Sequence, residues 1–162
     1  MVRLPEDDPE TFATYINFVY TNNVATNPSD GVKASSTFSN EFVDLCKLYV
    51  LSEKLCDMEA KNATVHAILA TNCKKASDGH TYAPGTKAVS IMYAGTLKDC
   101  PGRLLMADMW TITTAQYLAS NADELPRDFL VDLAVAFRKD RPTDKESVAK
   151  RADADRYLEK LE

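Results

Sequence analysis

The side chains best suited to nucleophilic or metal chemistry are four cysteines and two histidines: Cys46, Cys56, Cys73, Cys100, His66 and His80. Zinc sites use cysteines or histidines in pairs that are two to five residues apart, and no two of these residues have that spacing. A nucleophilic cysteine needs a lowered pKa in an accessible, positively charged site, whereas Cys46 lies in the most apolar stretch of the chain. We therefore interpret the cysteines as small core residues and predict no metal site.

The turn Asp78-Gly79-His80 is the other place where catalytic groups come together, because it puts a carboxylate beside an imidazole. Glycine after aspartate is ordinary turn chemistry, and no paired nucleophile is visible. A catalytic site needs a nucleophile, a base and a group that orients the base, and this turn offers only part of that set. No glycine-rich phosphate loop exists either. The sequence predicts no catalytic residues, no cofactor and no enzyme activity.

The composition narrows the classes of partner and compartment. The chain has 162 residues and a net charge of -5, so it lacks the clustered basic surface that phosphate contacts require. No apolar run approaches the length of a membrane span, and the first residues carry no signal-peptide pattern. Unpaired cysteines favour a reducing compartment. We expect a soluble intracellular protein, in the cytoplasm or the nucleus, that contacts neither nucleic acid nor membrane.

The chain from Glu41 to Leu69 contains two helical patterns that meet at Cys56-Asp57. Apolar residues cover most of the circumference of the first pattern: Phe42, Leu45, Cys46, Leu48, Tyr49, Leu51 and Leu55. This spacing predicts a buried helix. Asp57 is the expected N-cap of the second helix, whose alanines suit close packing against the first. The two patterns predict a tight helical hairpin.

An earlier helix is expected from Pro9 to Tyr20. Asp8 is suited to be its N-cap, Pro9 fits its first position, and Asn22 tolerates the left-handed conformation that often ends a helix. Its apolar stripe consists of Phe12, Tyr15, Ile16, Val19 and Tyr20. The residues 22–38 that follow are rich in Asn, Ser, Thr, Gly and Pro, so they predict a long surface loop with its likeliest turn at Pro28–Gly31.

Further helical patterns follow the hairpin, and together they predict an all-α bundle of about six or seven helices. One pattern begins after Pro84-Gly85 and ends at Gly95, and a longer one runs from Pro101 to Leu118, where the threonines of 111–114 weaken the pattern and predict a frayed or bent helix. The longer pattern carries Trp110, which we expect in the core. Another begins at Leu125-Pro126 and stops before Pro142. The residues 143–146 form a capping box that opens a mostly charged terminal helix.

Two of these segments resemble the BTB (POZ) domain. The stretch Leu48-Tyr49-Val50-Leu51-Ser52-Glu53-Lys54-Leu55, followed by Ala60-Lys61-Asn62, is similar to the C-terminal helices of that family, with Ser52 and Ala60 as departures. The residues 4–21 resemble the strand-to-helix passage that ends in tyrosine-threonine-glycine, with Asn22 in place of the glycine. The resemblance implies the C-terminal half of a BTB domain.

The later segments resemble the helical extension of fungal BTB proteins. The phrases that carry this resemblance are Ile91-Met92-Tyr93-Ala94-Gly95-Thr96, Arg103-Leu104-Leu105-Met106-Ala107-Asp108 and Phe129-Leu130-Val131-Asp132-Leu133. The resemblance implies a partial BTB domain at residues 1–75 with a loop insertion at 22–38, a helical extension at 76–142 packed on it, and the charged terminal helix at 143–162.

What the resemblance implies for function is protein–protein interaction by a non-catalytic adapter or by a regulatory fragment of one. A complete BTB domain starts with a strand-rich half that nothing before Met1 supplies, so we expect the first helix to expose part of its apolar face. The predicted partner-binding residues are Phe12, Tyr15, Phe18 and Val19, of which two are expected to face inward. The implied partners are a cullin of a ubiquitin ligase, for which the chain would be a substrate adapter, or another BTB protein. The alternative is an inert, truncated BTB fragment without a partner, and the oligomeric state stays open.

Overall fold

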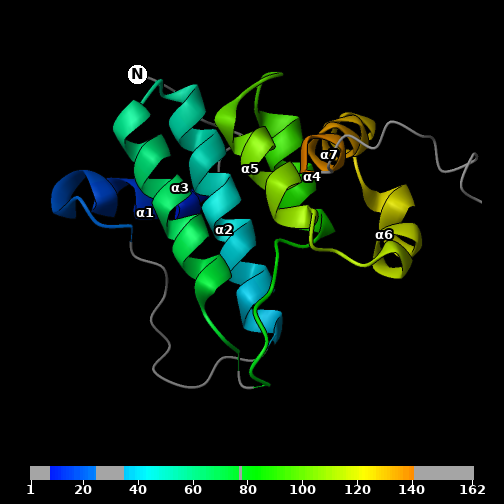
Figure 1. Cartoon of the computed structure of the whole chain (residues 1–162). Helices are drawn as coiled ribbons and strands as arrows, with labels where there is room; N and C mark the ends of the chain where they lie inside the picture. Colours follow the sequence, from blue (N-terminus) through cyan, green and yellow to red (C-terminus); the bar gives the residue numbers. More distant parts are fainter. Residues whose placement is uncertain (1–7, 25–34, 77, 141–162) are drawn as a thin grey trace, which may run out of the picture.

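The computed structural model describes residues 8–24, 35–76 and 78–140 (Figure 1), and regular structure in these ranges is helical throughout. The elements are α1 (Pro9–Thr21), α2 (Ser35–Lys54), α3 (Met58–Cys73), α4 (Thr86–Gly95), α5 (Pro101–Trp110), α6 (Ala115–Asn121), the short 3-10 helix η1 (Ala122–Glu124) and α7 (Arg127–Asp140). The predicted all-α bundle of six or seven helices is therefore confirmed. None of the described helices is long and apolar enough to cross a membrane.

The predicted hairpin of α2 and α3 forms the centre of the molecule (Figure 1). The reversal takes place at Cys56, whose φ of 56° is left-handed, and Asp57 begins α3 by accepting a hydrogen bond from the Ala60 amide at 2.9 Å. The helix α2 packs against α1, α3 and α4, so its apolar circumference is covered on several sides. The predicted burial of this helix and the predicted N-cap are both confirmed.

Three aromatic rings join the later helices around α7. Phe129 of α7 makes edge-to-face contacts with Tyr93 of α4 and Trp110 of α5, at centroid distances of 5.4 and 5.3 Å. The indole of Trp110 donates to the Pro84 carbonyl at 2.8 Å, which satisfies its one polar atom inside the core. Trp110 and Phe129 are almost completely buried, as expected for Trp110.

Arg103 connects α5 to the end of α4. It donates to the Tyr93 carbonyl at 2.7 Å and to the Thr96 carbonyl and hydroxyl, and its guanidinium lies 4.6 Å from the centroid of the Tyr93 ring. Helix C-termini leave carbonyl oxygens without intrahelical donors, and a cation there also matches the helix dipole. The buried arginine therefore caps α4 and fixes the start of α5 against it.

Two sequence-based boundaries were wrong. The longer helix expected from Pro101 to Leu118 ends at Trp110, and α6 starts separately at Ala115, where the Thr114 hydroxyl accepts from the Tyr117 amide at 3.2 Å. Threonine side chains compete for backbone donors, so the threonine run breaks the helix. The loop expected over 22–38 is also shorter, because α2 begins at Ser35 and Phe38 is already 2% exposed.

Several expectations concern residues outside the described ranges. They are the turn at Pro28–Gly31, the stop at Pro142, and the capping box and terminal helix of residues 143–162. Among the described residues, one hydrophobic core runs from Phe42 of α2 to Ala136 of α7, across the boundary expected near residue 75. The division into a BTB part and an extension stays a prediction.

Candidate protein interface

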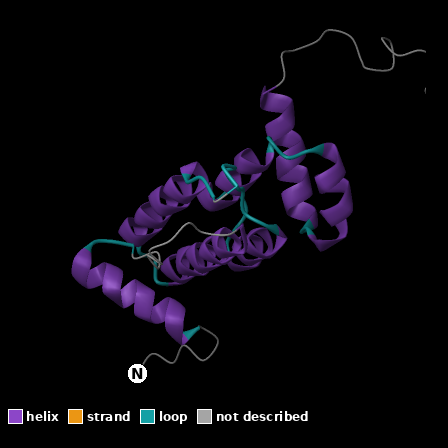
Figure 2. Ribbon diagram, turned by 90° about the horizontal axis from the view of Figure 1, so that it is seen from below, coloured by secondary structure: helices purple, strands orange, loops and turns teal. Residues whose placement is uncertain are grey.

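The helix α1 lies at the edge of the helical body, where it packs mainly on α2 (Figure 2). One of its faces is turned toward α2 and α3. Thr11 and Phe18 on this face are 8% and 5% exposed, and Tyr15 between them is half-buried. These three residues are four and three positions apart, the spacing of neighbours along one side of a helix. These side chains pack α1 against the rest of the molecule.

Polar contacts fix both the start and the middle of α1. Asp8 caps the helix by accepting from the Glu10 amide, and it also accepts from the Lys47 ammonium of α2 at 2.8 Å. The hydrogen bond from Lys47 holds the pKa of Asp8 below its ordinary value. The Tyr15 hydroxyl donates to Asp57 at 2.9 Å, and partial burial together with this bond raises the pKa of Tyr15. One carboxylate oxygen of Asp57 thus accepts the hydrogen bond from Tyr15 of α1, and the other caps α3.

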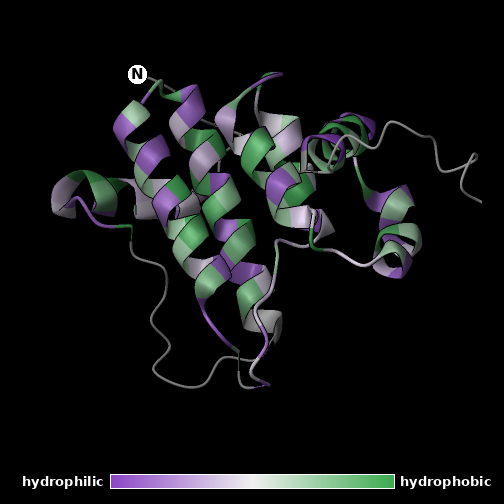
Figure 3. Ribbon diagram, viewed as in Figure 1, coloured by the Kyte–Doolittle hydropathy of each residue, from purple (hydrophilic) through white to green (hydrophobic). Residues whose placement is uncertain are grey.

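A second face of α1, beside the face that packs on α2 and α3, is apolar and open to solvent. The exposed fractions of its large side chains are 39% for Phe12, 37% for Ile16, 54% for Val19 and 85% for Tyr20. These residues recur after four, three and one positions, so they form one continuous stripe. Figure 3 shows α1 at the edge of the molecule, with green hydrophobic positions between pale and purple polar ones. We call these four residues the outer face of α1.

The outer face also lacks charge. From Thr11 to Val24 the sequence contains no Asp, Glu, Lys or Arg. Exposed helix faces usually carry charged residues, and an apolar surface that extends beyond the packed face of a helix is typical of one with a further neighbour. The described part of the chain supplies a neighbour on one side only. This surface is the strongest candidate for a site in the described residues.

The structure separates the four predicted partner-binding residues into two pairs. Phe18 and Tyr15 face α2 and α3, whereas Phe12 and Val19 lie on the outer face. Ile16 and Tyr20 belong to the same face and were not among the predicted residues. The helical spacing places both residues in the apolar stripe of this helix, but the spacing alone does not say which residues of the stripe stay exposed.

The four cysteines lie in different environments. Cys46 and Cys100 are buried as expected, but Cys56 and Cys73 are exposed, so the interpretation of the cysteines as core residues was wrong for these two. Both lie at helix ends, where a residue in an apolar pattern can still be exposed to solvent. Burial raises the pKa of the Cys46 thiol to about 12, so it stays protonated at neutral pH. Within the described ranges no three metal-ligating side chains come together.

The turn at Asp78 uses its carboxylate for structure. One oxygen accepts from the His80 amide at 2.9 Å and the other from the Tyr82 hydroxyl, and Gly79 between them has a φ of 80°. The hydrogen bond from Tyr82 keeps the pKa of Asp78 below its ordinary value. The carboxylate thus closes an Asx turn, the interpretation that its sequence favoured.

No protein-family model, curated protein or solved structure matches the chain.

Proposed function

We propose that this protein is a non-catalytic protein–protein interaction module, a BTB-like adapter, that binds a partner protein through the outer face of α1. The observation that carries the proposal is an uncharged apolar stripe on a helix that is itself well anchored. A contiguous exposed apolar patch on a folded protein is typical of an interaction site.

The chemistry of the outer face suits a protein partner. Complete burial of an aliphatic or aromatic side chain is worth roughly 1.5–3 kcal/mol, and much of this surface is still in water. Phe12 and Tyr20 stand at the two ends of the stripe, and aromatic anchors of this kind often dominate binding energy. The anchored backbone adds to the affinity, since little conformational freedom would be lost on binding.

The resemblance to the BTB family suggests the kind of partner. In that family a strand-rich half covers the equivalent helix, so we propose that the partner presents a similar apolar surface, carried by another BTB protein. An apolar and uncharged partner surface also fits the absence of charge between Thr11 and Val24. A cullin is the second partner that the resemblance suggests, and it is tested in parallel. The competing proposal is an inert fragment whose outer face binds nothing.

The test combines light scattering across a size-exclusion peak with calorimetric titration. The full chain is titrated with a purified BTB protein and, separately, with a purified cullin N-terminal region. The disabling variant is Val19→Asp, because Val19 is 54% exposed and its replacement leaves the inner face of α1 intact. The matched control is Leu97→Asp, which adds the same charge at a residue that is 76% exposed in the turn after α4.

We expect binding to the BTB protein that Val19→Asp weakens at least about tenfold, the ratio that corresponds to roughly 1.4 kcal/mol, while Leu97→Asp binds like the wild type. Binding to the cullin alone, with the same dependence on Val19, would support the adapter function and identify a cullin as the partner instead of a BTB protein. A monomer at every concentration that binds neither protein would contradict the adapter function and support the inert fragment.

A further inference from the structure

The helix α6 contributes little to the core. None of its residues is buried, and it follows the turn of residues 111–114. Its main attachments are the ring of Tyr117, 5.8 Å from Trp110, and the half-buried Leu118. The helix therefore keeps a distance from α7 that its own side chains do not fill.

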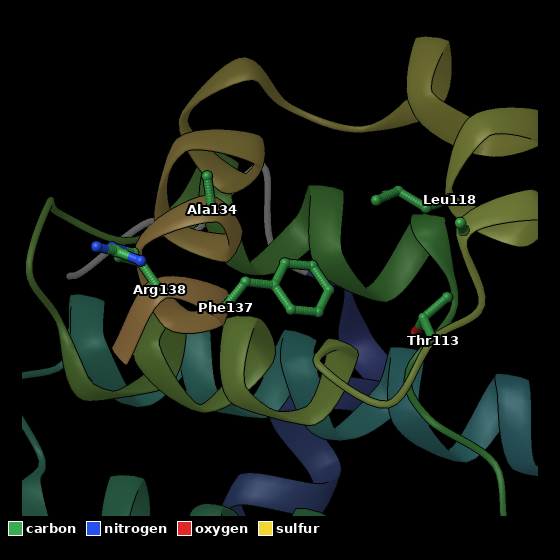
Figure 4. A pocket seen from close by; sticks show the side chains of 6 residues that line it. Thr113, Leu118, Ala134, Phe137 and Arg138 are labelled. Atoms are coloured by element: carbon green, nitrogen blue, oxygen red, sulfur yellow. The ribbon is translucent and has the colours of Figure 1, made fainter. Parts of the chain in front are cut away.

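A groove of about 500 Å³ separates the two helices (Figure 4). Thr113, Ala115 and Leu118 form one wall, and Ala134, Phe137 and Arg138 of α7 form the other. The phenyl ring of Phe137 points into the space between the walls (Figure 4). Five of the six lining residues present methyl or ring carbons, so the groove is hydrophobic with one cation at its side.

Arg138 gives the groove its polarity. It is exposed, and no carboxylate in the described ranges forms an ion pair with it. The C-terminal end of α7 is near, because the helix ends at Asp140, two residues later. An occupant with apolar side chains and a nearby carboxylate would complement both properties of the groove.

We propose that residues 143–162 of the same chain occupy this groove. The segment begins three positions after Asp140, the last residue of α7, and contains twenty residues, more than enough to reach back along the helix. Its large apolar residues are Val148, Tyr157, Leu158 and Leu161, and it also contains three alanines. Glu159 follows Leu158, and Glu162 follows Leu161. The segment therefore offers carboxylates for Arg138 together with apolar side chains for the walls of the groove.

Because the segment is attached to α7, weak contacts are sufficient for it to occupy the groove. A tethered segment meets its groove at a local concentration in the millimolar range, so a contact surface too small for a separate peptide still becomes occupied. Occupation would also support α6, which lacks buried residues of its own.

Trypsin cleavage of the full-length protein tests the proposal, with fragments followed by mass spectrometry. The segment contains five tryptic residues at Lys145, Lys150, Arg151, Arg156 and Lys160, so occupation of the groove slows its cleavage. The groove variant is Ala134→Glu, an exposed lining position where an added charge spares the core. The control is Val135→Glu, the next residue of α7, which is 49% exposed and lies outside this groove. A second variant, Leu158→Glu, alters the segment itself.

We expect the wild-type segment to be cleaved at least about tenfold more slowly than a free peptide of residues 141–162. Ala134→Glu and Leu158→Glu should each restore most of the rate of the free peptide, and Val135→Glu should not. Cleavage of the wild type at the rate of the free peptide would overturn the proposal. Equal acceleration by Ala134→Glu and Val135→Glu, or no acceleration by Ala134→Glu and Leu158→Glu, would overturn it as well. Circular dichroism of each variant confirms that the helices are retained.

Discussion

The helices α1 and α2 have similar sequence patterns but different surroundings. Both carry large apolar residues on more than one side. In α2 the side chains of Phe42, Leu48 and Tyr49 are at most 1% exposed, because α1, α3 and α4 cover this helix from different directions. In α1 the inner residue Phe18 is buried, whereas the outer residue Val19 is 54% exposed.

The comparison shows that an apolar pattern indicates that a helix face needs to be buried, but it does not say which neighbour buries that face. For α2 the described chain supplies the cover. For α1 it covers one face and leaves the outer face exposed. The following predictions test how far the two helices differ.

The largest difference is expected from truncating one phenylalanine in each helix. Phe42→Ala should lower the free energy of unfolding by about 3–5 kcal/mol, because it leaves a cavity in the centre of the core. Phe12→Ala should cost roughly 1 kcal/mol or less, since this ring is 39% exposed and already partly hydrated. Urea titration followed by circular dichroism measures both. Similar losses for the two variants would show that the outer face of α1 is part of the core.

The next largest loss of stability is expected at Gly102, where α5 lies close to α2. A Cβ atom at Gly102 would lie 2.8 Å from both Met92 Sδ and Tyr49 Cε1, and the Gly102 amide donates to the Tyr49 hydroxyl at 3.2 Å. Gly102→Ala should therefore destabilise the protein by about 1–3 kcal/mol, although alanine favours helix. Thermal unfolding measures the change. An unchanged or higher melting temperature would show that Tyr49 and Met92 can move aside.

A smaller effect is expected where α1 is attached to the hairpin. Tyr15→Phe removes the hydroxyl that donates to Asp57, which should cost about 1 kcal/mol. Tyr20→Phe is the matched control on the outer face, where the side chain is 85% exposed and no loss is expected. Hydrogen exchange of the α1 amides should increase for Tyr15→Phe alone. Equal exchange in the two variants would mean that the bond to Asp57 does not hold α1.

The smallest effect is the response of α1 to acid. The pKa of Asp8 is lowered in the folded protein, mainly by the hydrogen bond from Lys47, so the unfolded chain binds a proton more readily. The stabilisation by Asp8 is complete above its ordinary pKa of 3.8 and is lost as the pH falls through the lowered value. Asp8 is exposed, so the change should be modest. Nuclear magnetic resonance of the α1 amides between about pH 5 and pH 2 measures it, and Asp8→Asn should abolish the pH dependence.

Local chemistry made much of the fold predictable. Asp8, Asp57 and Asn22 have side chains that suit the ends of helices, and they occupy those ends. The burial of α2 also followed from its pattern, because a helix with apolar residues all round must be covered. The break after Trp110 was underestimated, since the competition of threonine side chains for backbone donors depends on whether packing holds the helix together.

The candidate site was only partly predictable. The sequence selected α1 and expected two of its four chosen residues to face inward, but it did not say which two. The positions of Tyr15 and Phe18 against the hairpin depend on the crossing of α1 over α2, which no spacing within α1 encodes. Arg103 is a similar case, because a lone cation in a sequence predicts exposure, whereas here it finds the carbonyl groups at the end of α4.

The sequence by itself determined that the protein is helical, where most of its helices begin, and that α1 and α2 are apolar on several sides. These properties depend on contacts between residues that are close in the chain, such as caps and helical neighbours. Only the tertiary structure decided which apolar faces are covered, which pair of α1 residues stays exposed, and that α6 and α7 enclose a groove. Burial is a property of the whole packed chain, because each face is covered by residues that are distant in sequence.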